Sequence, residues 1–249
     1  MLKFIRKVGI SFINQLNKST KRRLLSTSFF GKKISFSLEK TRRYLFQGNT
    51  KLILIGANDG ISFDDLFQKL DPTKVSGLVL EPSGKYFQLL KSNLSDFKDI
   101  GFLNFAISSS NDLITIYQLN EQGLSKLPEW GRGIGSVSKD HLLKFGNIND
   151  EDIEVLQVPG INFMYLISSY PRFAKVDYLQ IDTEGYDAEI IKMIDFKRFK
   201  VDLIKIEWVN LTPFEKVEVD NILKSNGFIL FLLGEDLIAA SESVNLFFK

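Results

Sequence analysis

Short apolar runs alternate with amphipathic segments from Lys51 onward, and this alternation is the main pattern in the chain. Runs of about six apolar residues are typical of buried strands, whereas apolar residues spaced three and four apart indicate one face of a helix. Alternating strands and helices predict βαβ units. The expected fold class is therefore α/β, a Rossmann-like, doubly wound and mostly parallel sheet with helices on both faces.

The individual elements follow from the same pattern and from helix-capping signals. Helices are expected at 62–70, from Ser83 onward, at 186–193, and after Thr212, which forms a capping box with Glu215. Residues 119–150 show little periodicity and several glycines, so we expect a long functional connection there. Strands are expected at 51–57, 76–81, 101–108, 113–118, 176–182, 201–208, 228–234 and 243–249.

Charge divides the chain into two parts. Residues 1–50 hold 12 lysines and arginines and the single acid Glu39, whereas the rest holds 20 basic and 29 acidic residues. We expect residues 1–50 to be a basic, helical extension able to meet an anionic surface such as a membrane, and 51–249 to be the catalytic domain. An acidic domain argues against nucleic acid as a partner.

Composition excludes several kinds of site. The chain has no cysteine and one histidine, so disulfide scaffolds, thiolate nucleophiles and multi-histidine zinc sites are excluded. No stretch resembles a secretory signal or approaches the length of a membrane span. The expected location is the cytoplasm. The basic segment could in addition hold the protein at the membrane surface as a peripheral protein.

Candidate chemistry lies where the expected strands end, because ligands of doubly wound sheets bind at the carboxyl ends of the strands. The sequence GANDG, from Gly56 to Gly60, follows the first strand, and Glu81 follows the second. Glycines let the backbone approach a ligand closely, and a carboxylate can accept hydrogen bonds from both ribose hydroxyls. The pair predicts a nucleoside cofactor.

The charge of this turn indicates which nucleoside. A dinucleotide needs the spacing G-x-G-x-x-G, whereas this turn has G-x-x-x-G with Asp59, Asp64 and Asp65 close by. Carboxylates repel a pyrophosphate but tolerate the sulfonium and ammonium of S-adenosyl-L-methionine. We therefore expect S-adenosyl-L-methionine as the cofactor. An NAD(P)-dependent oxidoreductase is the alternative enzyme, and a non-catalytic binding module of a membrane-associated sugar-assembly complex is the alternative of another class.

The sequence resembles the FkbM-type methyltransferases, which are S-adenosylmethionine-dependent O-methyltransferases with the class I methyltransferase fold. The resemblance covers residues 51–231. It rests on IGANDG (55–60), LEPS (80–83), NFAIS (104–108), LQIDTEGYDAEII (179–191) and IKIEW (204–208), in that order.

The resemblance implies roles for individual residues. The methionine part of the cofactor would lie against Gly56, Ala57, Asn58 and Gly60, with Asp59 and Asp182 beside them. Glu81 would hold the ribose, and the adenine side would meet Pro82, Ser83, Ala106 and Ile107. The acceptor class that the resemblance implies is a sugar hydroxyl on a polysaccharide or glycolipid precursor.

Three acidic residues follow the fourth and fifth core strands and supply candidates for catalysis. Strand alternation places Asp182 and Glu184 on one side, and Glu207 ends the next strand. Transfer to a hydroxyl requires a base, for which Asp182, Glu184 and His141 are the candidates. The three carboxylates could instead hold Mg²⁺, although no further ligand pattern supports this and we expect no metal. Trp130 and Arg132, in the glycine-rich connection, are candidates for contact with a glycan or nucleotide-sugar acceptor.

Overall fold

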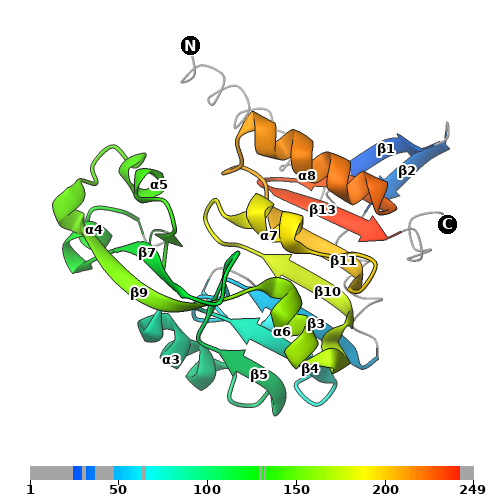
Figure 1. Ribbon diagram of the computed structural model, residues 1–249, viewed down its shortest axis with the longest axis horizontal. Helices are drawn as coiled ribbons and strands as arrows, with labels where there is room; N and C mark the ends of the chain where they lie inside the picture. Colours follow the sequence, from blue (N-terminus) through cyan, green and yellow to red (C-terminus); the bar gives the residue numbers. More distant parts are fainter. Residues whose placement is uncertain are drawn as a thin grey trace.

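The computed structural model describes residues 25–29, 32–36, 48–62, 66–128, 131 and 133–241, the first two ranges as backbone only. A seven-stranded sheet forms its centre (Figure 1) in the order β12-β13-β11-β10-β3-β4-β5. Only β13 runs antiparallel to its neighbours. The strands are β3 (Thr50–Ile55), β4 (Val75–Leu80), β5 (Asp99–Leu103), β10 (Lys175–Ile181), β11 (Lys200–Glu207), β12 (Phe228–Leu233) and β13 (Asp236–Ser241).

Helices cover both faces of this sheet because its central strands are apolar on both sides. One face packs against α6 (Phe163–Ser169), α7 (Asp187–Met193) and α8 (Pro213–Ser225). The other packs against the 3-10 helix η1 (Phe67–Lys69) and α3 (Gly84–Asn93). The expected doubly wound α/β architecture is confirmed.

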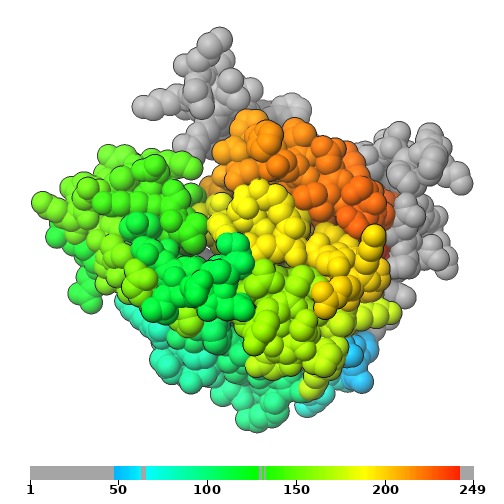
Figure 2. Space-filling model, viewed as in Figure 1, coloured from blue at the N-terminus to red at the C-terminus, as the bar shows by residue number. Residues whose placement is uncertain are grey.

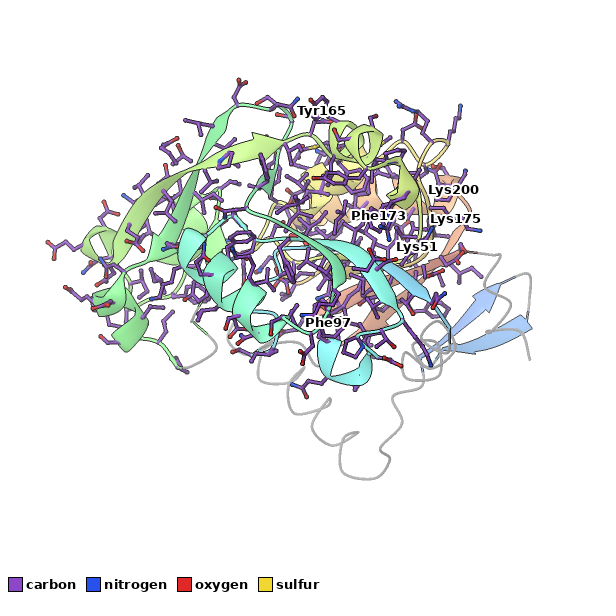
Figure 3. All side chains as sticks on the ribbon, turned by 90° about the horizontal axis from the view of Figure 1, so that it is seen from below. Lys51, Phe97, Tyr165, Phe173, Lys175 and Lys200 are labelled. Carbon is purple, nitrogen blue, oxygen red and sulfur yellow. The ribbon has the colours of Figure 1, made fainter. Side chains whose placement is uncertain are left out.

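The parallel strands give the sheet two chemically different ends. Lys51, Lys175 and Lys200 lie at the amino ends of β3, β10 and β11, on one side of the molecule (Figure 3). The carboxyl ends face the opposite way. The chain runs outward from β3 to β4 and β5 in one direction and from β10 to β11 in the other, so the switch point lies between β3 and β10.

Residues 106–161 form a second unit beyond those carboxyl ends, which we call the lobe. Its four-stranded sheet has the order β6-β9-β7-β8, and β7 and β9 pair antiparallel along their length. Leu119, Ile134, Leu142 and Ile148 form its small core. A hollow separates the lobe from α7 in the space-filling view (Figure 2). Its elements are β6 (Ala106–Ile107), β7 (Leu113–Leu119), α4 (Glu121–Ser125), β8 (Gly135–Ser136), α5 (Lys139–Leu143), η3 (Asp150–Asp152) and β9 (Ile153–Ile161).

Several sequence predictions are confirmed in detail. The helix expected after Ser83 is α3, with Ser83 as its N-cap, and the helix expected at 186–193 is α7. The capping box of α8 is present: the Thr212 hydroxyl accepts a hydrogen bond from the Glu215 amide, and the Glu215 carboxylate accepts one from the Thr212 amide. Side-chain capping accounts for the start of α8, whereas Ser83 and Tyr186 make no side-chain capping hydrogen bond at the starts of α3 and α7.

Other predictions were wrong. The strand expected at 101–108 is two strands in two sheets, because Asn104 turns the chain there by donating to the carbonyls of Glu81 and Pro82. The connection 119–150 contains α4, β8 and α5 where it is described, and β13 at 236–241 was not expected; the strand expected at 243–249 lies outside the described residues.

The basic segment also differs from expectation where it is described. Leu25–Phe29 (β1) and Lys32–Phe36 (β2) form an antiparallel hairpin, so the expected helical extension is wrong for these two stretches. The other residues before Gly48, and residues 63–65 of the helix expected at 62–70, lie outside the described part of the chain. Within that part, no helix has the length and apolar character needed to cross a bilayer.

Candidate active site

The turn after β3 approaches its neighbours too closely for side chains. Gly56 has a φ of 79°, and a Cβ there would lie 1.8 Å from the carbonyl oxygen of Asp182 at the end of β10. Gly60 has a φ of 80° and packs on Leu90 of α3. Both positions require glycine, because left-handed backbone and direct contact exclude a side chain. The turn is therefore fixed between two strands at the switch point.

Glu81 ends β4 beside this turn and is buried, with 7% of its surface exposed. Its Oε2 accepts a hydrogen bond from the Asn58 amide at 2.9 Å, and its Oε1 accepts one from the Ser83 amide at 2.8 Å. Burial raises the pKa of Glu81 to about 7, against the opposing effect of these two amides. Each oxygen keeps a lone pair for a ligand hydroxyl.

Asp59 lines the pocket and also stabilises the turn. Its carboxylate accepts hydrogen bonds from the Ile61 and Ser62 amides and from the Ser62 hydroxyl. Burial raises the pKa of Asp59, but these donors outweigh that effect and lower it overall. Asp64 and Asp65 lie outside the described residues, so the expected acidic crowding of this turn rests on the sequence.

A second turn follows β10 and carries the next two carboxylates. Glu184 has a φ of 54°, which is unusual for a residue other than glycine. The buried Asp187, at the start of α7, holds this turn by accepting hydrogen bonds from the Thr183 amide and hydroxyl. Asp182 and Glu184 both line the pocket, but the alternation argument for this was wrong, because β10 ends at Ile181 and the backbone then turns.

The lobe and the α8 side of the sheet meet at Glu184. Its Oε2 lies 3.1 Å from Nε2 of His141, a residue of α5 that is only 5% exposed. The Asn210 amide donates to the same Oε2 at 3.0 Å, and the Ser136 hydroxyl donates to the Glu184 backbone carbonyl at 2.8 Å. The lobe thus supplies two of the groups that fix the position of Glu184.

Asp182, Glu184 and Glu207 form a compact carboxylate cluster. Each offers an oxygen, and the three oxygens lie within 4.8 Å of one another. Burial, and then the charges of Asp187 and Glu184, raise the pKa of Asp182 to about 8. Burial and the neighbouring carboxylates also raise the pKa of Glu207. Like charges at this distance disfavour one another, so these carboxyl groups retain protons to higher pH unless a positive group lies between them.

One pocket of about 250 Å³ joins these features. It lies between the carboxyl ends of the strands and the lobe, and contains every residue that the sequence analysis assigned to the cofactor. Those residues are Gly56, Ala57, Asn58, Asp59, Gly60, Glu81, Pro82, Ser83, Ala106, Ile107 and Asp182. Glu184 and Glu207 also line it, whereas His141 lies behind Glu184 and is not part of its wall.

Further lining residues were missed from the sequence. Gln180 lies beside Leu54 on the neighbouring strand and adds a polar group to the wall of the pocket. Gln118 of β7 and residues 133–135 and 137 reach the pocket from the lobe. In this last stretch, only the glycines indicated a functional segment from the sequence. The contact between the lobe and the pocket depends on long-range packing, which the local sequence does not show. Trp130 and Arg132 lie outside the described residues.

The comparison with known proteins gives a family match. The model of the methyltransferase FkbM domain matches residues 55–230. No curated protein matches the sequence.

Several solved structures are similar to this chain at low scores. A precorrin-6y C5,15-methyltransferase from Geobacter metallireducens has 16% identity and a TM-score of 0.40, with 82% of this chain and 86% of that chain covered. A SAM-dependent O-methyltransferase from Thermotoga maritima has 11% identity and a TM-score of 0.40, with coverages of 83% and 66%. A fibrillarin pre-rRNA processing protein from Methanococcus jannaschii has 12% identity and a TM-score of 0.39, with coverages of 90% and 86%. Because these scores are low, the family assignment depends on the domain match alone.

Proposed function

Because the chain belongs to the family of methyltransferase FkbM domains, whose methyl donor is S-adenosyl-L-methionine, we propose that it is an O-methyltransferase acting on a sugar hydroxyl of a glycan or glycolipid precursor. The observation that carries this proposal is the single pocket that joins the Gly56–Gly60 turn and Glu81 to the carboxylates Asp182 and Glu184. Donor and acceptor groups therefore share one space.

The donor half is proposed to bind at the switch point. Glu81 accepts hydrogen bonds from the ribose hydroxyls with the lone pairs that its two amide partners leave free. The methionine part lies along Gly56–Gly60, where the two glycines leave the backbone accessible to a ligand. The adenine lies against Ala106 and Ile107. The same site suits NAD(P) poorly, because the turn offers no helix N-terminus with the glycine spacing that a pyrophosphate needs.

The acceptor half is proposed to bind between the carboxylate cluster and the lobe. No described residue lining the pocket is Lys, Arg or His, so the wall offers hydrogen-bond acceptors and no cationic group for a phosphate or carboxylate. That supports a neutral, hydroxyl-rich acceptor. The hydroxyl oxygen attacks the methyl carbon in line with the breaking carbon–sulfur bond, S-adenosylhomocysteine leaves, and the hydroxyl proton passes to Glu184. His141, behind Glu184, holds the Glu184 carboxylate in position through the contact between its Nε2 and Oε2.

The test is methyl transfer from labelled S-adenosylmethionine to a panel of glycosides and lipid-linked saccharides, with nucleic acids and small phenols as comparison acceptors. We expect an O-methyl sugar in the hydrolysed product by mass spectrometry. Glu184→Gln should lower kcat by about 10² to 10³-fold, because it removes the base, and leave S-adenosylhomocysteine affinity within about threefold. Glu189→Gln, an acid on α7 paired with Lys192, is the matched control. Transfer to carbon or nitrogen, or full activity in Glu184→Gln, contradicts the proposal.

The basic segment is proposed to bring this cytoplasmic enzyme to an anionic membrane surface where a glycolipid acceptor is made. The support is the sequence charge of residues 1–50, 12 basic against one acidic. We expect the full chain to bind vesicles containing phosphatidylglycerol and to release as salt rises. Replacing Lys21, Arg22 and Arg23 by glutamine should weaken binding several-fold and leave S-adenosylhomocysteine affinity unchanged. Equal binding by the variant, measured by vesicle sedimentation, removes this part of the proposal.

A further inference from the structure

Buried carboxylates in this protein are elsewhere supplied with hydrogen-bond donors. Glu81 receives one backbone amide on each oxygen. Asp152, in the core of the lobe, receives the Lys126 ammonium at 2.7 Å and the Asn149 amide at 2.9 Å, both on Oδ2, while its buried Oδ1 has no partner among the described residues. Each of these two carboxylates therefore has at least two donors, one of them an ammonium in Asp152, to balance the charge that the fold buries.

Asp182, in the carboxylate cluster, differs in having no such donor. It is partly buried and lines the pocket, but none of the described side chains or amides donates a hydrogen bond to its carboxylate. Oε2 of Glu207 is buried and has no partner in the described part of the chain. Behind them, Asp187 has no exposed surface, its Oδ1 is likewise unpartnered, and its charge acts on both Asp182 and Glu207.

We propose that Asp182, Glu184 and Glu207 bind one divalent cation, Mg²⁺ or Mn²⁺, at the acceptor side of the pocket. The spacing is close to that of one ion: opposite oxygens on the same Mg²⁺ or Mn²⁺ are about 4.2 to 4.5 Å apart, and the three oxygens lie within 4.8 Å of one another, so shifts of a few tenths of an ångström suffice. All three ligands are carboxylate oxygens, the type that hard cations prefer. The unpartnered oxygens are the positions that such an ion fills.

Charge balance favours a divalent ion over the methyl donor as the partner of the cluster. S-adenosylmethionine carries one net positive charge, whereas the cluster and Asp187 together present four carboxyl groups. Lys205 is a described cation whose charge acts on Asp182, and its ammonium lies 3.5 Å from the carboxylate of Asp236. A divalent ion supplies the missing charge within the cluster itself.

This inference goes beyond the proposed function and does not require the acceptor to be a sugar. A cation in this position would hold the acceptor oxygen beside the methyl donor and make its hydroxyl easier to ionise. Glu184 can offer one oxygen to the ion while its Oε2 keeps the hydrogen bonds to His141 and Asn210. The cluster would then act as ligand and orienting group together.

The test measures binding of Mn²⁺ itself, without any acceptor. The full chain is stripped with EDTA, and free Mn²⁺ is followed by electron paramagnetic resonance during titration, with S-adenosylhomocysteine present and absent. We expect one Mn²⁺ per chain with a Kd below about 1 mM, displaced by Mg²⁺. Glu207→Gln and Asp182→Asn should each weaken binding by about tenfold or more. Glu218→Gln, an acid on α8 that pairs with Lys192, is the matched control and should bind as the parent does.

Three results would overturn the inference. The cluster is not a cation site if the parent binds S-adenosylhomocysteine but no Mn²⁺ up to about 5 mM. The same holds if Glu207→Gln and Asp182→Asn, shown to be folded by thermal melting, bind Mn²⁺ as tightly as the parent. If Glu207→Gln does not fold, Asp182→Asn decides. A third overturning result combines two observations: the parent binds no Mn²⁺, and Glu207→Gln loses affinity for S-adenosylmethionine but keeps its affinity for the neutral S-adenosylhomocysteine. The cluster would then stabilise the positive charge of the methyl donor and would not bind a cation. Failure of methyl transfer to sugars leaves all of these readouts intact.

Discussion

Two glutamates at the carboxyl ends of β4 and β11, with β3 and β10 between these strands, have different environments in the same pocket. Glu81 has both oxygens fixed by backbone amides and faces the donor half of the pocket. Glu207 keeps a buried oxygen without a described partner and faces the acceptor half. The position of Glu81 could be predicted from the sequence because it follows an apolar run at the second strand. The state of Glu207 could not, since it depends on Asp182 and Glu184 from another strand.

Glu81 leads to a pH prediction. Because burial raises its pKa to about 7, the carboxylate is largely protonated at pH 6 and ionised at pH 8, and only the ionised form accepts two ribose hydrogen bonds fully. Affinity for 5′-methylthioadenosine, which lacks the amino-acid end of the cofactor, should therefore fall by about tenfold from pH 8 to pH 6 by calorimetry. Glu81→Gln should bind more weakly at both values and show no such slope. A parent slope equal to that of Glu81→Gln contradicts the assignment.

The stability of the ligand-free protein should change in the opposite direction. A carboxyl whose pKa is higher in the folded than in the unfolded chain holds its proton longer when folded, so unfolding is favoured as pH rises. The contribution of Glu81 to the free energy of unfolding should therefore decline between about pH 4.5 and about pH 7 and be absent in Glu81→Gln. Denaturant unfolding of the two proteins across this range measures the difference.

At the scale of elements, helices with local signals were predictable and the lobe was not. The capping box of α8 and the N-cap of α3 are written in three or four consecutive residues. The strands β7 and β9 pair across more than thirty residues of intervening chain, and β9 was absent from the expected strands altogether. Pairing at such distance depends on tertiary contacts, which the local pattern does not record.

The loop from the lobe that meets the cofactor turn can be tested at one glycine. Gly133 has a φ of 87°, and a Cβ there would lie 1.8 Å from the Asn58 side-chain nitrogen, so the two segments touch without room for a methyl group. Gly133→Ala should weaken S-adenosylhomocysteine binding by about tenfold, since either the left-handed backbone or Asn58 must shift at a cost of about 1 to 2 kcal/mol. Gly146→Ala, where an added methyl meets nothing within 4 Å, is the control. Equal affinity in both variants, by calorimetry, would show that this contact does not shape the site.

At the scale of the whole molecule, the sequence pattern predicted the sheet and which strand ends form the site, because apolar runs and polar strand ends follow directly from burial. All the residues expected to meet the cofactor line one pocket. The lobe closes that pocket from a separate sheet, and its contribution to the site, including Gln118 and Ser136, required the three-dimensional arrangement.

Glu184 lies in the turn after β10, but its position also depends on the Ser136 hydroxyl and the His141 imidazole of the lobe. With Glu184 as the proposed base and the acceptor proposed to bind against the lobe, acceptor choice and base alignment are coupled through one part of the chain. Exchanging the lobe with that of a relative should then change which acceptor is admitted, and it should also misalign Glu184 unless the graft brings equivalents of Ser136 and His141. Under this proposal, the range of acceptors can change only through replacements that preserve both contacts.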